Sequence, residues 1–142
     1  KLLPYWRYET SCRETAKTDR IVFNKTGREN IMKCVLENTF VLAEEVEMAR
    51  TFFKRLKGLM FRPSMQEGTA MLLSPCPQIH TCFMKFPIDV LFLAEDGTVL
   101  YVMENLRPWR ISPIIRHAVQ TLEMPAGTLK GRVKVGHKVD FQ

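Results

Sequence analysis

The sequence lacks the features that mark several large classes of protein. No apolar run approaches the roughly 18–20 residues that a membrane-spanning helix needs. Cysteine is too sparse for a disulfide-built mini-protein, and no pair has the Cys-x-x-Cys spacing. The four cysteines are Cys12, Cys34, Cys76 and Cys82. Internal repeats and low-complexity tracts are absent as well. We therefore expect a hydrophobic core to hold the fold together.

Familiar catalytic motifs are also missing. We find no glycine-rich phosphate loop, no Gly-x-Ser-x-Gly elbow, no metalloprotease helix and no zinc-finger spacing. The sequence opens with Lys1 rather than Met, and the apolar stretch 2–6 is too short for a signal-peptide core. The compartment stays open at this point, with the cytoplasm favoured.

The composition that remains is that of an ordinary globular domain. The chain has 142 residues, of which 46% are hydrophobic and 25% charged, and this size suits one domain. Lys and Arg exceed Asp and Glu by 21 to 15, which gives a net charge of +6. This excess permits contact with polyanions or acidic surfaces without requiring it.

Short apolar segments separated by Gly and Pro turns predict a mainly β fold. We expect a jelly-roll-like β sandwich or barrel with one amphipathic helix, and an α+β fold is the alternative. Residues 1–20 are predicted to form an N-terminal arm, and residues 21–142 a single β domain. The expected strands are 21–23, 31–36, 40–45, 70–73, 79–86, 88–94, 98–103, 118–124 and 137–141.

The expected helix covers residues 47–60. Apolar residues recur there at spacings of three, four and seven, which predicts one apolar stripe packed on the sheet. They are Ala49, Phe52, Phe53, Leu56, Leu59 and Met60. Arg50, Lys54 and Lys57 lie on the opposite, solvated face. The alternative is that this basic face contacts phosphates, together with Arg55 and Arg62.

Asp96-Gly97 is the strongest hairpin signal in the chain. With a two-residue turn, Leu91 faces Val102 and Asp89 faces Glu104. Asp89 stands in an otherwise apolar strand, where a carboxylate needs partners or takes up a proton. It either ties a loop through hydrogen bonds or forms an acid–base pair with Glu104. The nearby cations are Lys85, Arg107 and Arg110.

Two further groups of side chains are candidates for ligand contact. In a strand over 79–86, His80, Cys82 and Met84 share one face, with Cys76 close in sequence. Such soft ligands suit copper(I) or zinc, but Cys and Met are also common core residues. We therefore predict neither a metal nor another cofactor. Trp109, between two arginines, is either a stacking platform for a ligand or a plug at the end of the core.

Several blocks of the sequence resemble the domain-of-unknown-function family 192 (DUF192). In family order they are LKGLM (56–60), SPC (74–76), IHT (79–81), MKFPIDVLFL (84–93), RPWR (107–110) and LEMPAG (122–127). The likeness covers about residues 39–142. It implies a small, mainly β sandwich with a short helix and no established activity. The matching hallmark positions are Gly58, Cys76, His80, Met84, Pro87, Asp89, Trp109, Arg110, Glu123 and Gly127. Cys82 and His137 depart from the family pattern, which has a bulky aromatic residue and an aspartate there.

The function favoured by these observations is a non-catalytic module that binds a small molecule or a peptide. We expect its pocket at one end of the sandwich, where polar groups converge beside an aromatic platform. The candidate residues are His80, Asp89, Glu104, Arg107, Trp109 and Arg110. The first alternative is a hydrolase or sugar-acting enzyme that uses Asp89 with Glu104, or His80. The second, less favoured, is nucleic-acid contact through the basic helix face. The ligand and the oligomeric state stay open.

Overall fold

The computed structural model describes residues 32–49 and 51–142, which form a mainly β domain as the sequence predicts. Its seven strands are β1 (Met32–Leu36), β2 (Phe40–Ala49), β3 (Thr69–Leu73), β4 (Ile88–Leu93), β5 (Val99–Leu106), β6 (Gln120–Pro125) and β7 (Val139–Phe141). One helix, α1 (Phe52–Lys57), follows β2. The predicted arm 1–20 and the predicted strand 21–23 lie outside the described residues. In the described part, no helix is long and apolar enough to cross a bilayer.

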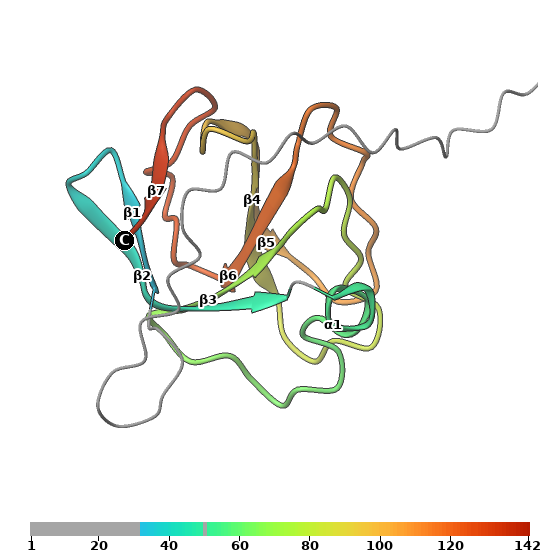
Figure 1. Ribbon diagram of the computed structural model, residues 1–142. Coiled ribbons are helices and arrows are strands. Elements are labelled where there is room, and N and C mark those ends of the chain that lie inside the picture. The colour runs from blue at the N-terminus through green and yellow to red at the C-terminus, as the bar shows by residue number, and fades with distance from the viewer. Residues whose placement is uncertain (1–31, 50) are drawn as a thin grey trace, which may run out of the picture. The chain divides into compact units, whose positions relative to one another are not determined.

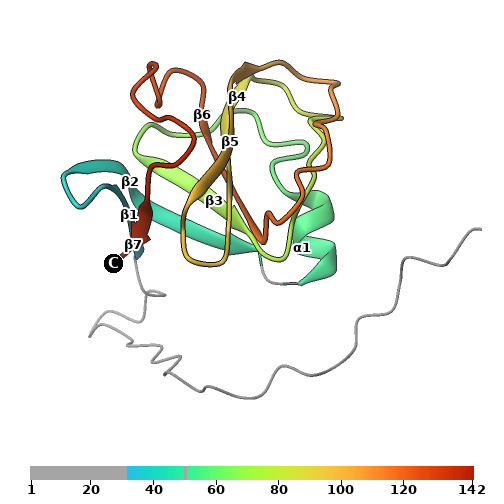
Figure 2. The same ribbon diagram turned by 90° about the horizontal axis from the view of Figure 1, so that it is seen from above.

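The seven strands form one mixed sheet that curls into a half-barrel (Figure 1). The strand order is β5-β4-β6-β3-β2-β1-β7, and β2 and β3 are parallel. A view from above shows α1 at one end of the sheet, beside the ends of β2 and β3 (Figure 2). The loops before β4 and after β5 lie at this same end in both views.

Each face of the sheet has its own hydrophobic core. Strand alternation places Leu91 and Leu122 on one face, within a cluster that includes Leu129 and Val139. The residues next to them in sequence, such as Val90, lie on the other face with Met71 and Phe92. A residue's position in β4 or β6 therefore decides which of the two cores its side chain enters.

The hairpin of β4 and β5 differs from the predicted register. Ala94 N donates to Thr98 O, so the turn has three residues, and Gly97 takes φ +84° at its end. Leu91 faces Val102 as predicted. The register shifts between Phe92 and Leu93 and again between Ile88 and Val90. Because of the second shift, Asp89 does not pair with Glu104. The counted register is therefore wrong at Asp89, because counting from the turn cannot reveal bulges.

The predicted helix over 47–60 is mostly wrong in extent. Residues 47–49 belong to β2, which pairs with β3 up to Ala49. The helix begins after Thr51, whose side chain accepts a hydrogen bond from Lys54 N at 3.2 Å. It ends at Gly58, which has φ +43°. No residue of α1 is buried, so Phe52, Phe53 and Leu56 of the predicted apolar stripe do not pack on the sheet, whereas Ala49 and Leu59 on either side of the helix do enter the core.

The predicted strand over 79–86 is also wrong. Within this range only His80 forms an isolated bridge, with Ile111, and the other residues form turns, bends or irregular chain. Thr81 explains this irregular path, since its buried hydroxyl accepts from Arg110 N and donates to Arg107 O at 2.7 Å. Side-chain bonds of this kind compete with a regular strand.

Candidate functional site

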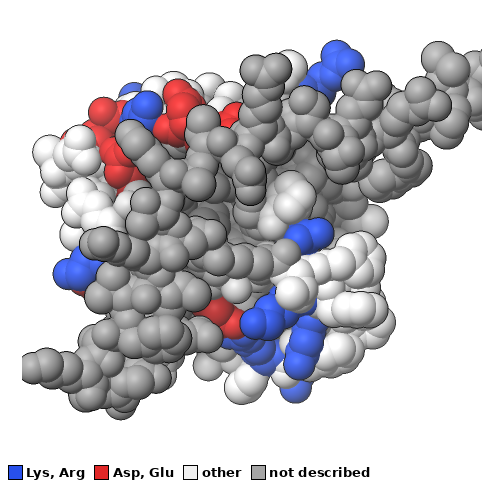
Figure 3. Space-filling model, viewed as in Figure 1, with Lys and Arg blue, Asp and Glu red and all other residues white. Residues whose placement is uncertain are grey.

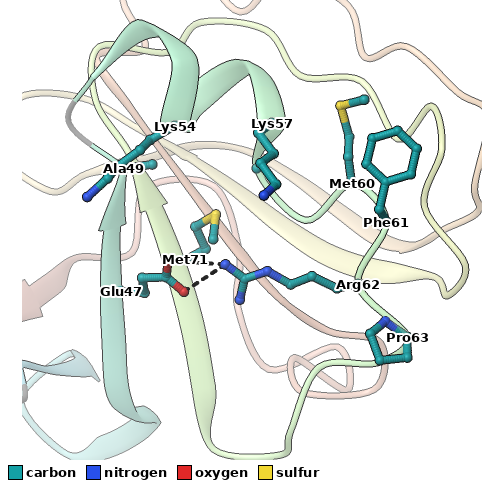
Figure 4. Close-up of a pocket in the computed structure, with 10 residues that line it drawn as sticks. Glu47, Ala49, Lys54, Lys57, Met60, Phe61, Arg62, Pro63 and Met71 are labelled. Atoms are coloured by element: carbon teal, nitrogen blue, oxygen red, sulfur yellow. Dashed lines mark hydrogen bonds and ion pairs between the residues drawn. The ribbon is translucent and has the colours of Figure 1, made fainter.

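A cavity of about 470 Å³ opens between α1, the chain that follows it, and the paired strands β2 and β3 (Figure 4). Parallel pairing of Glu47 with Met71 sets its floor. Gly58 and Phe61 both take positive φ, which turns the chain from α1 back over this floor. The lining residues are Glu47, Ala49, Lys54, Lys57, Gly58, Met60, Phe61, Arg62, Pro63 and Met71.

Cations dominate the charged groups that line the cavity. Arg62 Nη2 lies 3.1 Å from Oε1 and 2.9 Å from Oε2 of Glu47, which holds the guanidinium over the floor. Lys57 points into the same space above Met71, while Lys54 extends past Ala49 (Figure 4). Within the described chain, no carboxylate forms a salt bridge with either lysine. The cavity therefore presents an excess of positive charge.

Glu123 lies directly behind this cavity. It is 3% exposed, and its partner across the strands is Met71, so both side chains share one face of the sheet. Its Oε2 atom is buried without a hydrogen-bond partner in the described structure. A Cβ atom on Gly58 would lie 3.9 Å from this oxygen, so Glu123 is close to Gly58, which forms part of the cavity wall.

Burial raises the pKa of the Glu123 carboxyl from its ordinary 4.5 to about 8, and Arg62 opposes the shift only partly. Glu123 is therefore mainly a neutral acid at pH 7, able to donate a hydrogen bond. Burial also raises the pKa of the Cys76 thiol, although hydrogen bonds with Thr121 and Gln78 partly oppose the shift. A thiol of this kind is a poor nucleophile, so Cys76 contributes packing rather than chemistry.

Four of the six predicted site residues lie together in two loops. Thr81 joins these loops. Its backbone N–H donates to Arg110 O, its carbonyl accepts from Trp109 N, and its hydroxyl makes the two hydrogen bonds to the second loop described above. His80 is half-buried, with Nδ1 accepting from Cys82 N at 3.2 Å. The side chains of Arg107, Trp109 and Arg110 are exposed.

The Trp109 ring is a surface group rather than a core plug. It is 58% exposed, and its centroid lies 4.7 Å from that of Phe83. Phe83 in turn lies 5.4 Å from Phe61, which lines the cavity. A row of three aromatic rings thus leads from Trp109 to the cavity.

The other two predicted residues, Asp89 and Glu104, do not lie in these two loops. Asp89 is fully buried on the opposite face of the sheet from Glu123, where it accepts from Asn105 N at 2.8 Å and Leu129 N at 2.9 Å. Glu104 is exposed and accepts from Gly131 N at 3.0 Å. The expectation that all six residues share one pocket is therefore wrong for these two. Strand alternation directs Asp89 to the other core, and Glu104 bonds an amide there.

The structure also does not support the predicted set of soft metal ligands, which are Cys76, His80, Cys82 and Met84. Without a strand over 79–86, alternation no longer places His80, Cys82 and Met84 on one face. Met84 is buried in the core, and Cys76 Sγ donates to Gln78 O at 3.1 Å. Across residues 32–49 and 51–142, no three His, Cys, Asp or Glu side chains are placed to hold a metal ion.

Sequence reasoning missed the cavity and the position of Glu123 behind it. In the sequence analysis Glu123 is named only as a position shared with the family. It carries the same signal as Asp89, since both are carboxylates between apolar strand residues. The cavity itself joins residues of β2, α1 and β3, so its existence depends on tertiary packing. Lys57 and Arg62 are recognised only as members of a basic face.

The comparisons with known proteins agree on one family. The model of DUF192, described as "Uncharacterized ACR, COG1430", matches residues 33–141. A UPF0127 protein of Pyrococcus abyssi is 38% identical over 104 residues, which are 68% of this chain and 86% of that protein. A UPF0127 protein of Thermococcus sibiricus is 31% identical over 102 residues, which are 68% of this chain and 66% of that protein.

Two solved structures share the fold. A protein of unknown function from Novosphingobium aromaticivorans has 25% identity and a TM-score of 0.69, covering 82% of this chain and 88% of its own. A protein from Sinorhizobium meliloti, named as a candidate transcription regulator, has 27% identity and a TM-score of 0.66, covering 78% and 91%. The protein described here therefore belongs to the DUF192 family, whose function is uncharacterised.

Proposed function

We propose that this domain is a binding module for a small organic anion, held in the cavity beside α1. The observation that carries the proposal is the placing of Lys57 and Arg62 over a floor behind which Glu123 is buried. The volume of about 470 Å³ is within the range of pockets that hold small molecules.

The charges favour a carboxylate or phosphate group as the anchored part of the ligand. Lys57 and Arg62 supply charge-assisted hydrogen bonds, which are stronger than neutral ones. A neutral Glu123 behind the cavity wall does not repel an anion. Arg62 Nη2 already donates to the Glu47 carboxylate, so Arg62 offers a ligand only its remaining N–H groups.

The residues predicted around Trp109 extend this binding region in the proposal. The row of Phe61, Phe83 and Trp109 offers ring faces to an apolar or aromatic part of the ligand. Arg107, Arg110 and His80 lie in the loops that carry this row. Asp89 and Glu104 have a structural role in the same proposal, since both bond backbone amides.

An enzyme that uses Glu123 as a general acid is the second candidate. It is favoured by the raised pKa of this carboxyl beside a cavity, since such groups gather at active sites. The base that such a reaction needs is not among the residues that line the cavity, apart from Glu47, which Arg62 engages. We therefore place binding first.

Substitution of Lys54 and Lys57 by serine is expected to weaken anion binding by about 10- to 100-fold. Of the two lysines, Lys57 points into the cavity, and one hydrogen bond to a charged group contributes roughly 1.5–3 kcal/mol. Isothermal titration calorimetry with succinate, benzoate and inorganic phosphate measures the affinity. The double variant Lys130→Ser/Lys134→Ser removes two exposed lysines elsewhere and serves as the control. Equal affinity in both variants, or no binding of any of the three anions to the natural sequence, would refute the proposal.

A further inference from the structure

Exposed apolar side chains are concentrated in three segments, 51–63, 74–88 and 105–119, which we name the apolar-basic end. Nine of the thirteen large hydrophobic side chains that are exposed in the described chain lie in these segments. They are Phe52, Phe53, Leu56, Phe61, Phe83, Trp109, Ile111, Ile114 and Val119. Such a concentration is unusual for a surface that faces only water.

The three segments meet at one end of the domain. Each contributes one ring to the row of Phe61, Phe83 and Trp109, whose neighbouring centroids are 5.4 and 4.7 Å apart. Arg55 Nη1 donates to Ser74 O, and Phe61 N donates to Phe83 O. Figures 1 and 2 both show α1 and the two loops at this end. The exposed apolar groups therefore belong to one region.

The same three segments contain no acidic residue. Their basic residues are Lys54, Arg55, Lys57, Arg62, Lys85, Arg107, Arg110 and Arg116. On the face that Figure 3 shows, Lys and Arg gather beside α1, while most of the Asp and Glu lie at the upper left, away from it. The apolar-basic end is thus complementary to a surface that is both negatively charged and apolar.

The helix at this end contributes little to the core. No residue of α1 is buried, and Phe52 and Phe53 are 64% and 77% exposed. The Thr51 cap and the bond from Arg55 to Ser74 O fix the helix without them. The apolar residues of α1 are therefore available for contact with a partner outside the domain.

We propose that the apolar-basic end docks on an anionic membrane surface. Interfacial membrane segments combine large apolar side chains with interleaved Lys and Arg, which meet the acyl boundary and the anionic headgroups respectively. The alternation of Phe52, Phe53, Lys54, Arg55, Leu56 and Lys57 has this composition. Leu56, Ile111 and Ile114 favour lipid over nucleic acid, because aliphatic side chains give bases no stacking surface.

This inference goes beyond the proposed cavity function and fails or holds separately from it. The two surfaces share Lys54, Lys57, Phe61 and Arg62, but Phe52 and Phe53 do not line the cavity. Loss of vesicle binding in a variant of Phe52 and Phe53 that still binds small anions separates the two functions.

The test is co-sedimentation of the full chain with vesicles. We expect binding to phosphatidylcholine vesicles that contain about 30 mol% phosphatidylglycerol, at least about tenfold weaker binding to pure phosphatidylcholine, and weakening as salt is raised. The variant Phe52→Ser/Phe53→Ser should lose at least about tenfold in partitioning, since both rings leave the acyl boundary. The matched control is Val135→Ser, which removes an exposed apolar side chain outside the three segments.

Far-UV circular dichroism checks that the variant is folded, and Ile111→Ser/Ile114→Ser provides a second, independent variant. Absence of binding to the anionic vesicles would overturn the proposal. So would equal binding by both double variants and the natural sequence. Binding of single-stranded oligonucleotides without vesicle binding would assign this end to nucleic acid instead. Self-association that Phe52→Ser/Phe53→Ser abolishes, again without vesicle binding, would assign it to a second copy.

Discussion

Replacement of Asp89 by leucine is expected to lower the free energy of unfolding by about 4 kcal/mol. The carboxylate is fully buried and accepts from the amides of Asn105 and Leu129. Leucine has the same branched shape but leaves the buried amide of Leu129 and the partly buried amide of Asn105 without this acceptor, at roughly 1–3 kcal/mol each. Urea denaturation followed by circular dichroism measures the change.

The control for this prediction is Glu104→Ala. Glu104 is exposed and bonds one amide, Gly131 N, so its loss should cost less than about 1 kcal/mol. Asp89→Asn keeps one acceptor oxygen and should fall between the two. If Asp89→Leu unfolds within 1 kcal/mol of the natural sequence, the hydrogen bonds described for Asp89 do not hold the fold.

Replacement of Glu123 by glutamine should remove a strong pH dependence of stability. Below about pH 4.5 the carboxyl is protonated in both states. As the pH rises toward 8, the unfolded chain releases this proton while the folded protein, with its pKa of about 8, retains it. The free energy of unfolding therefore falls with rising pH over this window, by roughly 3 kcal/mol at pH 7. Glutamine does not titrate, so its variant should lose this slope.

The measurement compares urea midpoints at several pH values between about 5 and 8. Glu67→Gln, which changes an exposed glutamate, controls for the general effect of removing an acid. Equal slopes for Glu123→Gln and the natural sequence would show that Glu123 is not a buried neutral acid. A lost slope supports the view that this carboxyl costs stability at neutral pH, as residues retained for function often do.

The sequence predicts the strands well where a segment carries its own signal. β4 alternates between two apolar faces, and the turn at Gly97 begins β5, so this hairpin follows from local pattern. The length of the helix does not follow from local pattern, because the pairing of β2 with β3 extends through Ala49. Nothing in a window around 47–49 reveals a distant parallel partner strand.

The candidate site shows the same limit more sharply. Thr81 determines the loops at 79–86 and 107–111 through bonds across 26 and 29 residues, and no spacing rule predicts them. Asp89 and Glu123 look alike in sequence, yet one is satisfied by two amides and the other keeps an unpartnered oxygen. Only the fold tells a structural carboxylate from a candidate functional one.

The most direct test of the anion-binding proposal is a titration of ¹⁵N-labelled protein with succinate, followed by amide shifts in NMR spectra. The proposal predicts that the largest shifts fall on the amides of Lys57, Gly58, Phe61 and Arg62, and that Lys54→Ser/Lys57→Ser suppresses them. Saturable shifts centred instead on the amides of Asn105 and Leu129 around Asp89, or no saturable shift at all, would contradict it.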